Sequence, residues 1–262
     1  MSQSKSNDSD NKGEKSAWYL KVPASSVGES AVLVGDRSRI HIAATILENA
    51  QLLNEDRGLL TVTGEMNGVR ITVSAFGMGA PIAAVVMHEL ADLGVKTFIR
   101  LGTTLAVGPS VLGDYILASE AVVNEGTSHS YGNSASLAFP SKELNQLIVH
   151  TASEMNREIK IGPVISSDGF YPEMIVTRLG TSFNVAGKIK TFEDRGLIGS
   201  DMETSALFSV GQSLGVEVAS LCLATVKASD ASKLGGKERV MQERMLLEIG
   251  LRALSQNERN SV

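Results

Sequence analysis

Apolar runs and helical patterns alternate along most of the chain. Short apolar runs bounded by turn residues predict buried strands, whereas apolar positions spaced three and four apart predict helices that pack one face on a sheet. The segments that predict strands are 31–35, 59–66, 69–76, 95–101, 114–123, 160–166 and 216–226. Those that predict helices are 38–53, 80–93, 141–156, 201–214 and 236–255. The stretch 172–199 shows neither pattern clearly and is expected to be partly loop.

One hairpin interrupts this alternation. Asn67-Gly68 separates two apolar runs, and this dipeptide is a strong signal for a two-residue β-hairpin turn. Strands that alternate with helices, together with one antiparallel hairpin, predict an α/β protein. We therefore expect a three-layer α/β/α domain with a central mixed sheet.

Composition limits the function classes. The chain has 262 residues, enough for one domain with a large core. Residues 1–16 are almost entirely polar, which predicts a flexible polar tail ahead of a single domain at 17–262. A net charge of -5 gives no basic footprint for nucleic acid, and neither a membrane-spanning run nor a signal-peptide apolar region is present. With Cys222 as the one cysteine, an intrachain disulfide is impossible, so a cytoplasmic location is expected.

Arg100 is the most informative residue of the chain. It lies near the end of the predicted strand 95–101 and is followed by Gly102, Thr103 and Thr104. Ligands of open α/β sheets bind at the carboxyl ends of strands. A buried guanidinium requires an anionic partner, so Arg100 either holds an oxyanion such as phosphate or pairs with a carboxylate. This segment alone leaves both alternatives open.

Two glycine turns join a predicted strand to a predicted helix. Gly35 opens the first, and Arg39 lies in the first turn of the following helix, where the helix dipole disfavours positive charge unless an anion is bound. The second contains Gly77 and Gly79 but lacks the third glycine of a dinucleotide-binding loop, because residue 82 is isoleucine. It is expected to be a tight turn whose free amides face the edge of the sheet.

Further candidates each have a structural alternative. Phe170 and Tyr171 are adjacent aromatic residues that could form a flat wall for a heterocycle or pack in the core. Glu203 could accept hydrogen bonds from a diol, although acidic residues also favour the first turn of any helix. Asp230 follows the last strand and could act as a general acid or form a turn. Arg57, taken alone, indicates a solvated loop charge. The four histidines lack metal-ligand spacing.

Taken in order, these segments resemble the nucleoside phosphorylases of the uridine phosphorylase and hexameric purine nucleoside phosphorylase type. The resemblance extends from about Tyr19 to the C-terminal helix. It rests on Gly35-Asp36-x-x-Arg39, Gly77-Met78-Gly79-Ala80-Pro81, Glu89-Leu90-x-x-Leu93-Gly94, Arg100-x-Gly102-Thr103-Thr104, Ser166-Ser167-Asp168-x-Phe170-Tyr171-Pro172 and Met202-Glu203. The fourth and fifth of these look closest to uridine phosphorylases. The fold it implies is a mixed, partly barrel-like sheet surrounded by helices.

The resemblance also implies residue roles. Phosphate-binding roles fall on Gly35, Arg39, Arg57, Arg100 and Thr103. Nucleoside-binding roles fall on Tyr19, Thr104, Phe170, Arg178, Met202 and Glu203. Arg57 matches an arginine that the family lends to the phosphate of a neighbouring subunit, which implies a homo-oligomer built from dimers that share active sites, expected to be a hexamer. Tyr19 falls at about the position where the family usually has a histidine. Arg178 could substitute for the family arginine that recognises uracil only if its loop is rearranged.

The chemistry implied is phosphorolysis of a nucleoside to a free base and (deoxy)ribose 1-phosphate. Phosphate is the co-substrate, no metal or organic cofactor is required, and the catalytic roles fall on Arg100, Glu203 and Asp230. A uridine phosphorylase-like enzyme is the leading hypothesis. The alternative is a purine nucleoside phosphorylase, because Ser229-Asp230 resembles the Ser-Asp pair of purine enzymes. A nucleosidase and a non-catalytic nucleoside-binding protein are less favoured.

Overall fold

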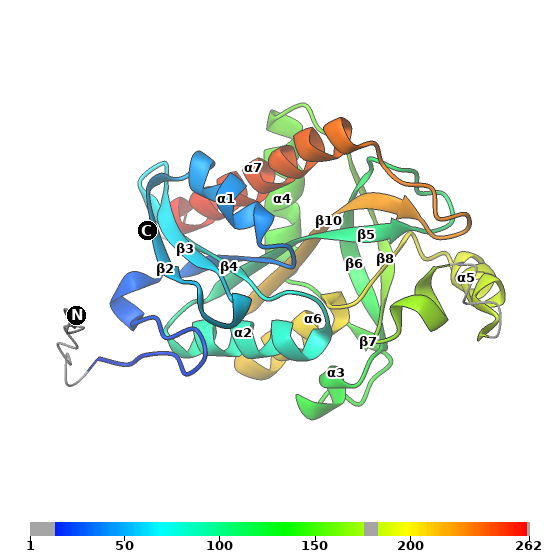
Figure 1. The fold of residues 1–262 in the computed structure, drawn as a ribbon, viewed down its shortest axis with the longest axis horizontal. Helices are drawn as coiled ribbons and strands as arrows, with labels where there is room; N and C mark the ends of the chain where they lie inside the picture. The colour runs from blue at the N-terminus through cyan, green and yellow to red at the C-terminus, as the bar shows by residue number, and fades with distance from the viewer. Residues whose placement is uncertain (1–13, 176–182, 261–262) are drawn as a thin grey trace, which may run out of the picture.

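The computed structural model describes residues 14–175 and 183–260 (Figure 1). Its strands are β1 (Ser30–Val34), β2 (Glu48–Asn54), β3 (Thr61–Met66), β4 (Val69–Ala75), β5 (Thr97–Ala106), β6 (Tyr115–Asn124), β7 (Leu137–Ala138), β8 (Ile159–Ser167), β9 (Gly199–Asp201) and β10 (Glu217–Lys227). Its α-helices are α1 (Ser38–Ile46), α2 (Ala80–Asp92), α3 (Thr127–Ser130), α4 (Lys142–Glu154), α5 (Val185–Asp194), α6 (Thr204–Leu214) and α7 (Gly236–Asn260). Short helical turns are η1 (Ala24–Ser26), η2 (Asp56–Gly58) and η3 (Phe170–Met174).

The strands of the described residues form one mixed sheet. Its order is β10-β6-β8-β9-β5-β1-β4-β3-β2, and β7 pairs with β6. Strand β10 also pairs with β5, which closes β10, β6, β8, β9 and β5 into a five-stranded barrel. Helices α1, α4 and α7 lie on one side of the sheet, and α2 and α6 lie on the other (Figure 1). The predicted fold, three-layered with a mixed and partly barrel-like sheet, is confirmed.

Strand β5 separates two halves of the core. Side chains alternate between the faces of a strand, so Ile99 packs in the same cluster as Leu246 of α7. Its neighbour Phe98 packs in the opposite cluster with Met87 of α2 and Phe208 of α6. All of these side chains are buried. The continuous apolar runs of the sequence therefore correspond to strands that are covered by helices on both faces.

Several predicted elements have different bounds in the structure. The predicted helix 38–53 ends at Ile46, because the chain turns into the edge strand β2, which pairs antiparallel with β3. Most of β2 is exposed, and Asn49 adopts a left-handed φ of 52° where the register shifts, so pairing at the sheet edge overrides the local helical pattern. The predicted helix 201–214 begins at Thr204, since Gly199–Asp201 forms strand β9.

The strand that carries Arg100 is longer than predicted. Strand β5 continues to Ala106, because β10 pairs with it over its whole length and β9 pairs with Leu105. The predicted strand ended at residue 101, whereas Gly102 lies within β5.

The ends of the chain complete the description. Residues 1–13 of the predicted polar tail lie outside the described residues, whereas Ser16 forms a β-bridge with Pro23. In the ranges that the structure describes, no helix has both the length and the apolar character that crossing a membrane requires.

Candidate active site

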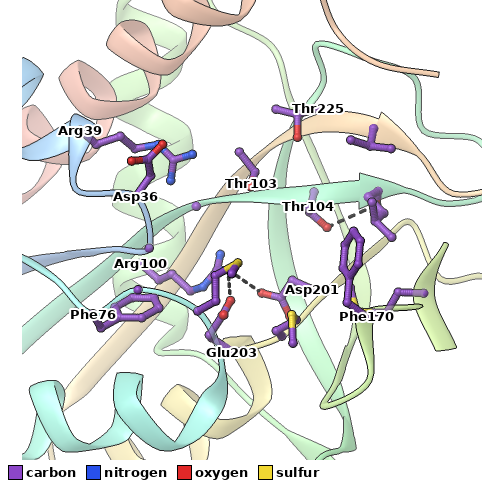
Figure 2. A pocket seen from close by; sticks show the side chains of 18 of the residues that line it. Asp36, Arg39, Phe76, Arg100, Thr103, Thr104, Phe170, Asp201, Glu203 and Thr225 are labelled. Atoms are coloured by element: carbon purple, nitrogen blue, oxygen red, sulfur yellow. Dashed lines mark hydrogen bonds and ion pairs between the residues drawn. The ribbon is translucent and has the colours of Figure 1, made fainter. Parts of the chain in front are cut away.

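A cavity of about 820 Å³ opens at the carboxyl edge of the sheet (Figure 2). Strand β1 ends at Val34 and β4 at Ala75, whereas β5 and β10 continue beyond them, which leaves space above the shorter strands. Nine of the residues predicted for the site line this cavity: Gly35, Arg39, Arg57, Arg100, Thr103, Thr104, Phe170, Met202 and Glu203. Residues that are far apart in the sequence are thus brought together in one site.

Strand pairing places Arg100 at the cavity although it lies in the middle of β5. Arg100 pairs with Leu33, one residue before β1 ends. Residues two apart on a strand share a face, so the Arg100 side chain lies over Gly102. A Cβ on Gly102 would lie 2.0 Å from Nη1 of Arg100. The Arg-x-Gly pattern therefore has a steric cause, since glycine provides the space that the guanidinium occupies.

Replacing Gly102 by alanine is expected to displace the Arg100 guanidinium. The overlap involves the charged end of a buried side chain, so we expect a loss of about 1–3 kcal/mol in unfolding free energy together with a loss of phosphate affinity. Urea unfolding and phosphate titration of the Gly102→Ala variant measure both. Gly68→Ala is the control for a glycine substitution, because its Cβ would meet open space, although its φ of 78° adds local strain. Unchanged phosphate binding in Gly102→Ala would contradict this role for the glycine.

Arg100 is paired with buried carboxylates inside the cavity wall. Its Nη2 lies 2.5 Å from Oε2 of Glu203 and 3.1 Å from Oδ2 of Asp201, and its Nη1 contacts Sγ of Cys222. Arg100 is only 3% exposed. Burial opposes its charge, but Cys222, Asp201 and Glu203 more than offset this and raise the pKa of Arg100 above its usual range. It therefore stays a cation next to two acids, and its buried Nε lacks a hydrogen-bond partner within the described residues.

The acids next to Arg100 come from the junction of β9 and α6. Asp201 accepts a hydrogen bond from Oγ of Ser166 at 2.5 Å and caps α6 by accepting from the amide of Thr204. Glu203 accepts from the amide of Gly79 at 2.7 Å as well as from Arg100. The Gly77-x-Gly79 turn thus directs an amide to the site, as the sequence predicted. Each oxygen of Glu203 accepts one of these hydrogen bonds, which orients the carboxylate. Both oxygens keep the capacity to accept a further hydrogen bond from a diol.

Arg39 lines a part of the cavity wall separate from that of Arg100 (Figure 2). It projects from α1 and is 3% exposed. Its Nη2 lies 3.1 Å from Oε1 of Glu243 on α7, and its Nη1 donates to the carbonyl oxygen of Leu101 at 3.3 Å. Gly35 allows this turn to pack closely, because a Cβ there would lie 2.8 Å from the carbonyl oxygen of Gly77. The two glycine turns therefore meet at the floor of the cavity.

Aromatic and hydroxyl side chains complete the lining. Phe170 packs edge-on against Tyr171, with ring centroids 5.1 Å apart, and in Figure 2 Asp201 lies between Phe170 and Arg100. Thr104 donates to the carbonyl oxygen of Ser200 at 3.0 Å, so its hydrogen is already used within the protein. These positions give the cavity a charged end and an aromatic end.

Three predicted residues are not among those that line the cavity. Tyr19 lies beside it, with its ring 5.1 Å from Cζ of Arg57, and its amide donates to Glu89. Asp230 lies exposed in a turn and accepts from the amide of Ser232, and hydrogen bonds from Ser232 lower the pKa of Asp230. Arg178 falls outside the described residues.

Sequence reasoning missed part of the site. Asp201 directly precedes the Met202-Glu203 motif, but that motif does not indicate a pairing with Arg100. Glu243 is far from its partner Arg39 in the chain. Arg239 also lines the cavity and pairs with Glu243 at 2.9 Å. The four-residue spacing of Arg239 and Glu243 is a signal for a pair on one helix face, but it does not reveal what that face meets.

Comparisons with known proteins agree with this geometry. The family model described as the phosphorylase superfamily matches residues 29–246. The uridine phosphorylase of Haemophilus influenzae is 33% identical over 190 residues, which cover 71% of this chain and 75% of that protein. The DeoD-type purine nucleoside phosphorylase of Geobacillus kaustophilus is 30% identical over 246 residues, covering 91% of this chain and 98% of that protein.

A solved structure extends the likeness to three dimensions. The uridine phosphorylase of Vibrio fischeri superposes with a TM-score of 0.79 at 29% identity, covering 94% of this chain and 99% of that chain. The predicted relationship to uridine and purine nucleoside phosphorylases is confirmed by both kinds of similarity. This chain belongs to the phosphorylase superfamily.

Proposed function

We propose that this protein is a nucleoside phosphorylase, a pentosyltransferase that converts a nucleoside and inorganic phosphate to a free base and (deoxy)ribose 1-phosphate. The observation that carries this proposal is the contact between Arg100 and Glu203 at 2.5 Å in the cavity wall. A group suited to an oxyanion and a group suited to a sugar diol lie side by side. A phosphate and a ribose bound there would be adjacent, as attack at the anomeric carbon requires.

The charge balance of the cavity suits a phosphate dianion. Five arginines line it, namely Arg37, Arg39, Arg57, Arg100 and Arg239, against three carboxylates, Asp36, Asp201 and Glu203. The excess positive charge favours an anionic ligand over a neutral one. We assign phosphate to Gly35, Arg39, Arg100 and Thr103, which lie around the floor of the cavity, with Arg57 at its rim. Phosphate is the co-substrate, and the proposed reaction uses no metal or organic cofactor.

Electrostatics also explains the chemistry. Cleavage of the N-glycosidic bond develops positive charge on the sugar, as in glycoside hydrolysis. A phosphate dianion held by arginines on one face stabilises that charge and then attacks the anomeric carbon. Glu203 and Met202 would orient the ribose, and Phe170 would pack against the base at the aromatic end. The departing base carries away the electron pair of the broken bond, so hydrogen bonding or protonation assists it.

A uridine phosphorylase-like activity is the leading proposal, and a purine nucleoside phosphorylase is the second. The purine candidate is supported by the likeness to DeoD-type enzymes and by the 28% identity, over 205 residues, to the guanosine phosphorylase of Halorubrum lacusprofundi. A general acid must hold a proton at the working pH. The exposed position and lowered pKa of Asp230 do not favour that role in the free chain.

Asp230→Asn distinguishes the two candidates. We expect uridine phosphorolysis to stay within about twofold of wild type, because general acid catalysis contributes about 100-fold or more where it operates. Initial rates with uridine and inosine measure the effect. A loss of about 100-fold confined to purine nucleosides would instead assign Asp230 the proton transfer of a purine enzyme.

The assembly is also part of the proposal. Arg57 and Tyr19 stack at the rim of the cavity, and both are exposed in the single chain. We propose that this rim meets a second copy, so that dimers share active sites and assemble further into a hexamer. Light scattering measures the mass directly. A monomer with full activity would contradict shared sites.

We also propose a cytoplasmic location and a role in nucleoside salvage for this protein.

Substrate choice tests the proposed function. The protein is incubated with uridine, inosine, adenosine or methylthioadenosine, each with and without inorganic phosphate, and the free base is quantified. The proposal predicts base release that requires phosphate, with uridine as the preferred substrate. Release at the same rate without phosphate would identify a nucleosidase, and no release from any nucleoside would favour a binding protein.

A further inference from the structure

One buried carboxylate holds two arginines of the cavity. Oε1 of Glu243 lies 3.1 Å from Nη2 of Arg39 and 2.9 Å from Nε of Arg239. The side chains of Glu243 and Arg39 are 7% and 3% exposed, whereas that of Arg239 is 42% exposed. One carboxylate oxygen is thus shared by two guanidiniums, and both arginines line the cavity.

The guanidinium of Arg39 is held by two groups that do not line the cavity. Its two terminal nitrogens donate to different partners, one to the carbonyl oxygen of Leu101 on β5 and the other to Glu243 on α7. Its Nε is buried and lacks a hydrogen-bond partner within residues 14–175 and 183–260. A guanidinium offers its donors in one rigid plane, so fixing both terminal nitrogens also fixes the direction of Nε. The orientation of the Arg39 guanidinium is therefore set by these two contacts.

The carboxylate of Asp36 provides a second observation that Arg39 and Arg239 lie near the same part of the cavity wall. Its carboxylate lines the same cavity. Burial acts to raise the pKa of Asp36, but hydrogen bonds from Ser38 and the charges of Arg39 and Arg239 lower it overall. Both guanidiniums are thus close enough to act on one acid at the cavity wall.

We propose that Glu243 is a positioning residue, which sets the plane of Arg39 and holds Arg239 at the cavity as a further anion-binding cation from α7. Glu243 does not line the cavity and acts only through these two arginines. The inference rests on the proposed function, because inorganic phosphate is the anion assigned to this wall. It predicts that α7, which supplies core packing on its apolar face, also tunes phosphate affinity.

Calorimetric titration with inorganic phosphate tests the proposal. Glu243→Gln keeps the size of the side chain and one accepting oxygen but removes the negative charge that holds both guanidiniums. We expect phosphate to bind about tenfold more weakly, because neutral hydrogen bonds orient the arginines less firmly than charge-assisted ones. The KM for the nucleoside is expected to stay near the wild-type value. Glu248→Gln is the matched control, because Arg244 and Glu248 form a pair of the same spacing on α7 at 3.1 Å and neither residue lines the cavity.

A double-mutant cycle separates positioning from folding. If Glu243 acts through Arg39, Glu243→Gln should weaken phosphate binding much less in an Arg39→Gln background than in wild type. Arg239→Gln leaves the buried Arg39–Glu243 pair intact, so it remains informative if Glu243→Gln fails to fold, and it too should weaken phosphate binding. Wild-type affinity in Glu243→Gln or in Arg239→Gln would overturn the inference. Absence of phosphate binding by the wild-type protein would instead overturn the proposed function.

Discussion

Arg100→Lys is expected to lower kcat/KM for phosphate at least about 100-fold while the protein stays folded, the size of effect seen when one preorganised donor is removed from a transition-state site. Lysine keeps the positive charge that Asp201 and Glu203 require. It loses the planar fork that can hold two carboxylates and still present a free edge to an oxyanion. The change therefore removes anion recognition and retains charge compensation.

Lysine is more informative here than alanine. Arg100→Ala would leave two buried acids without their cation, and breaking a buried ion pair in this way costs about 3–5 kcal/mol. Its loss of activity would then report unfolding as much as phosphate binding. Arg244→Lys on the outer face of α7 is the matched control for the substitution itself, since Arg244 does not line the cavity. Thermal unfolding and phosphate-dependent initial rates are measured for both variants. Wild-type kinetics in Arg100→Lys would contradict a phosphate role for Arg100.

Glu203→Gln is expected to lower kcat/KM for ribonucleosides about 100-fold, because it removes a charged acceptor aimed at the sugar where positive charge develops. The amide oxygen of glutamine can still accept from Gly79, so the glycine turn stays in place. The loss should be smaller with a 2′-deoxynucleoside, since that substrate already lacks one of the hydroxyls that Glu203 would bind. The preference for ribose over deoxyribose should therefore shrink in the variant.

Glu125→Gln provides the comparison for Glu203→Gln. Glu125 is also a buried glutamate that accepts hydrogen bonds from two amides and two hydroxyls, including Oγ of Ser205 at 2.9 Å, but it does not line the cavity. It is expected to affect stability without changing the ratio of ribose to deoxyribose substrates. If Glu203→Gln lowers the rates with both sugars by the same factor, Glu203 acts on the fold or on Arg100 rather than on the diol.

The parts of the fold that were predicted correctly depend on local chemistry. The Asn67-Gly68 hairpin was predictable, because a two-residue turn dictates the pairing of the strands that flank it, and β3 and β4 pair as expected. Strand β2 was missed because its residues pair only along one edge and bury little, so their helical spacing was misleading. The end of β5 was misplaced because its last residues are held by pairing with β10 and β9, which lie far along the chain.

The site was predicted as a set of motifs rather than as a geometry. Arg39, Arg100 and Glu203 were found because their motifs follow strands or open helices, where topology brings side chains to one edge. Their partners were not predictable in the same way. Arg100 meets Asp201 about a hundred residues further along, and Arg39 meets Glu243 about two hundred residues further along. Such contacts depend on the closure of the barrel and on the packing of α7, which no local pattern encodes.

The stoichiometry of the reaction tests the central claim most directly. Uridine, or whichever nucleoside the protein prefers, is incubated with inorganic phosphate, and the sugar product is followed by phosphorus NMR while the free base is quantified in the same sample. Because phosphate held by Arg39 and Arg100 is the proposed nucleophile, we predict one molecule of pentose 1-phosphate formed and one phosphate consumed for each base released. Release of free pentose with no phosphate consumed would contradict the account.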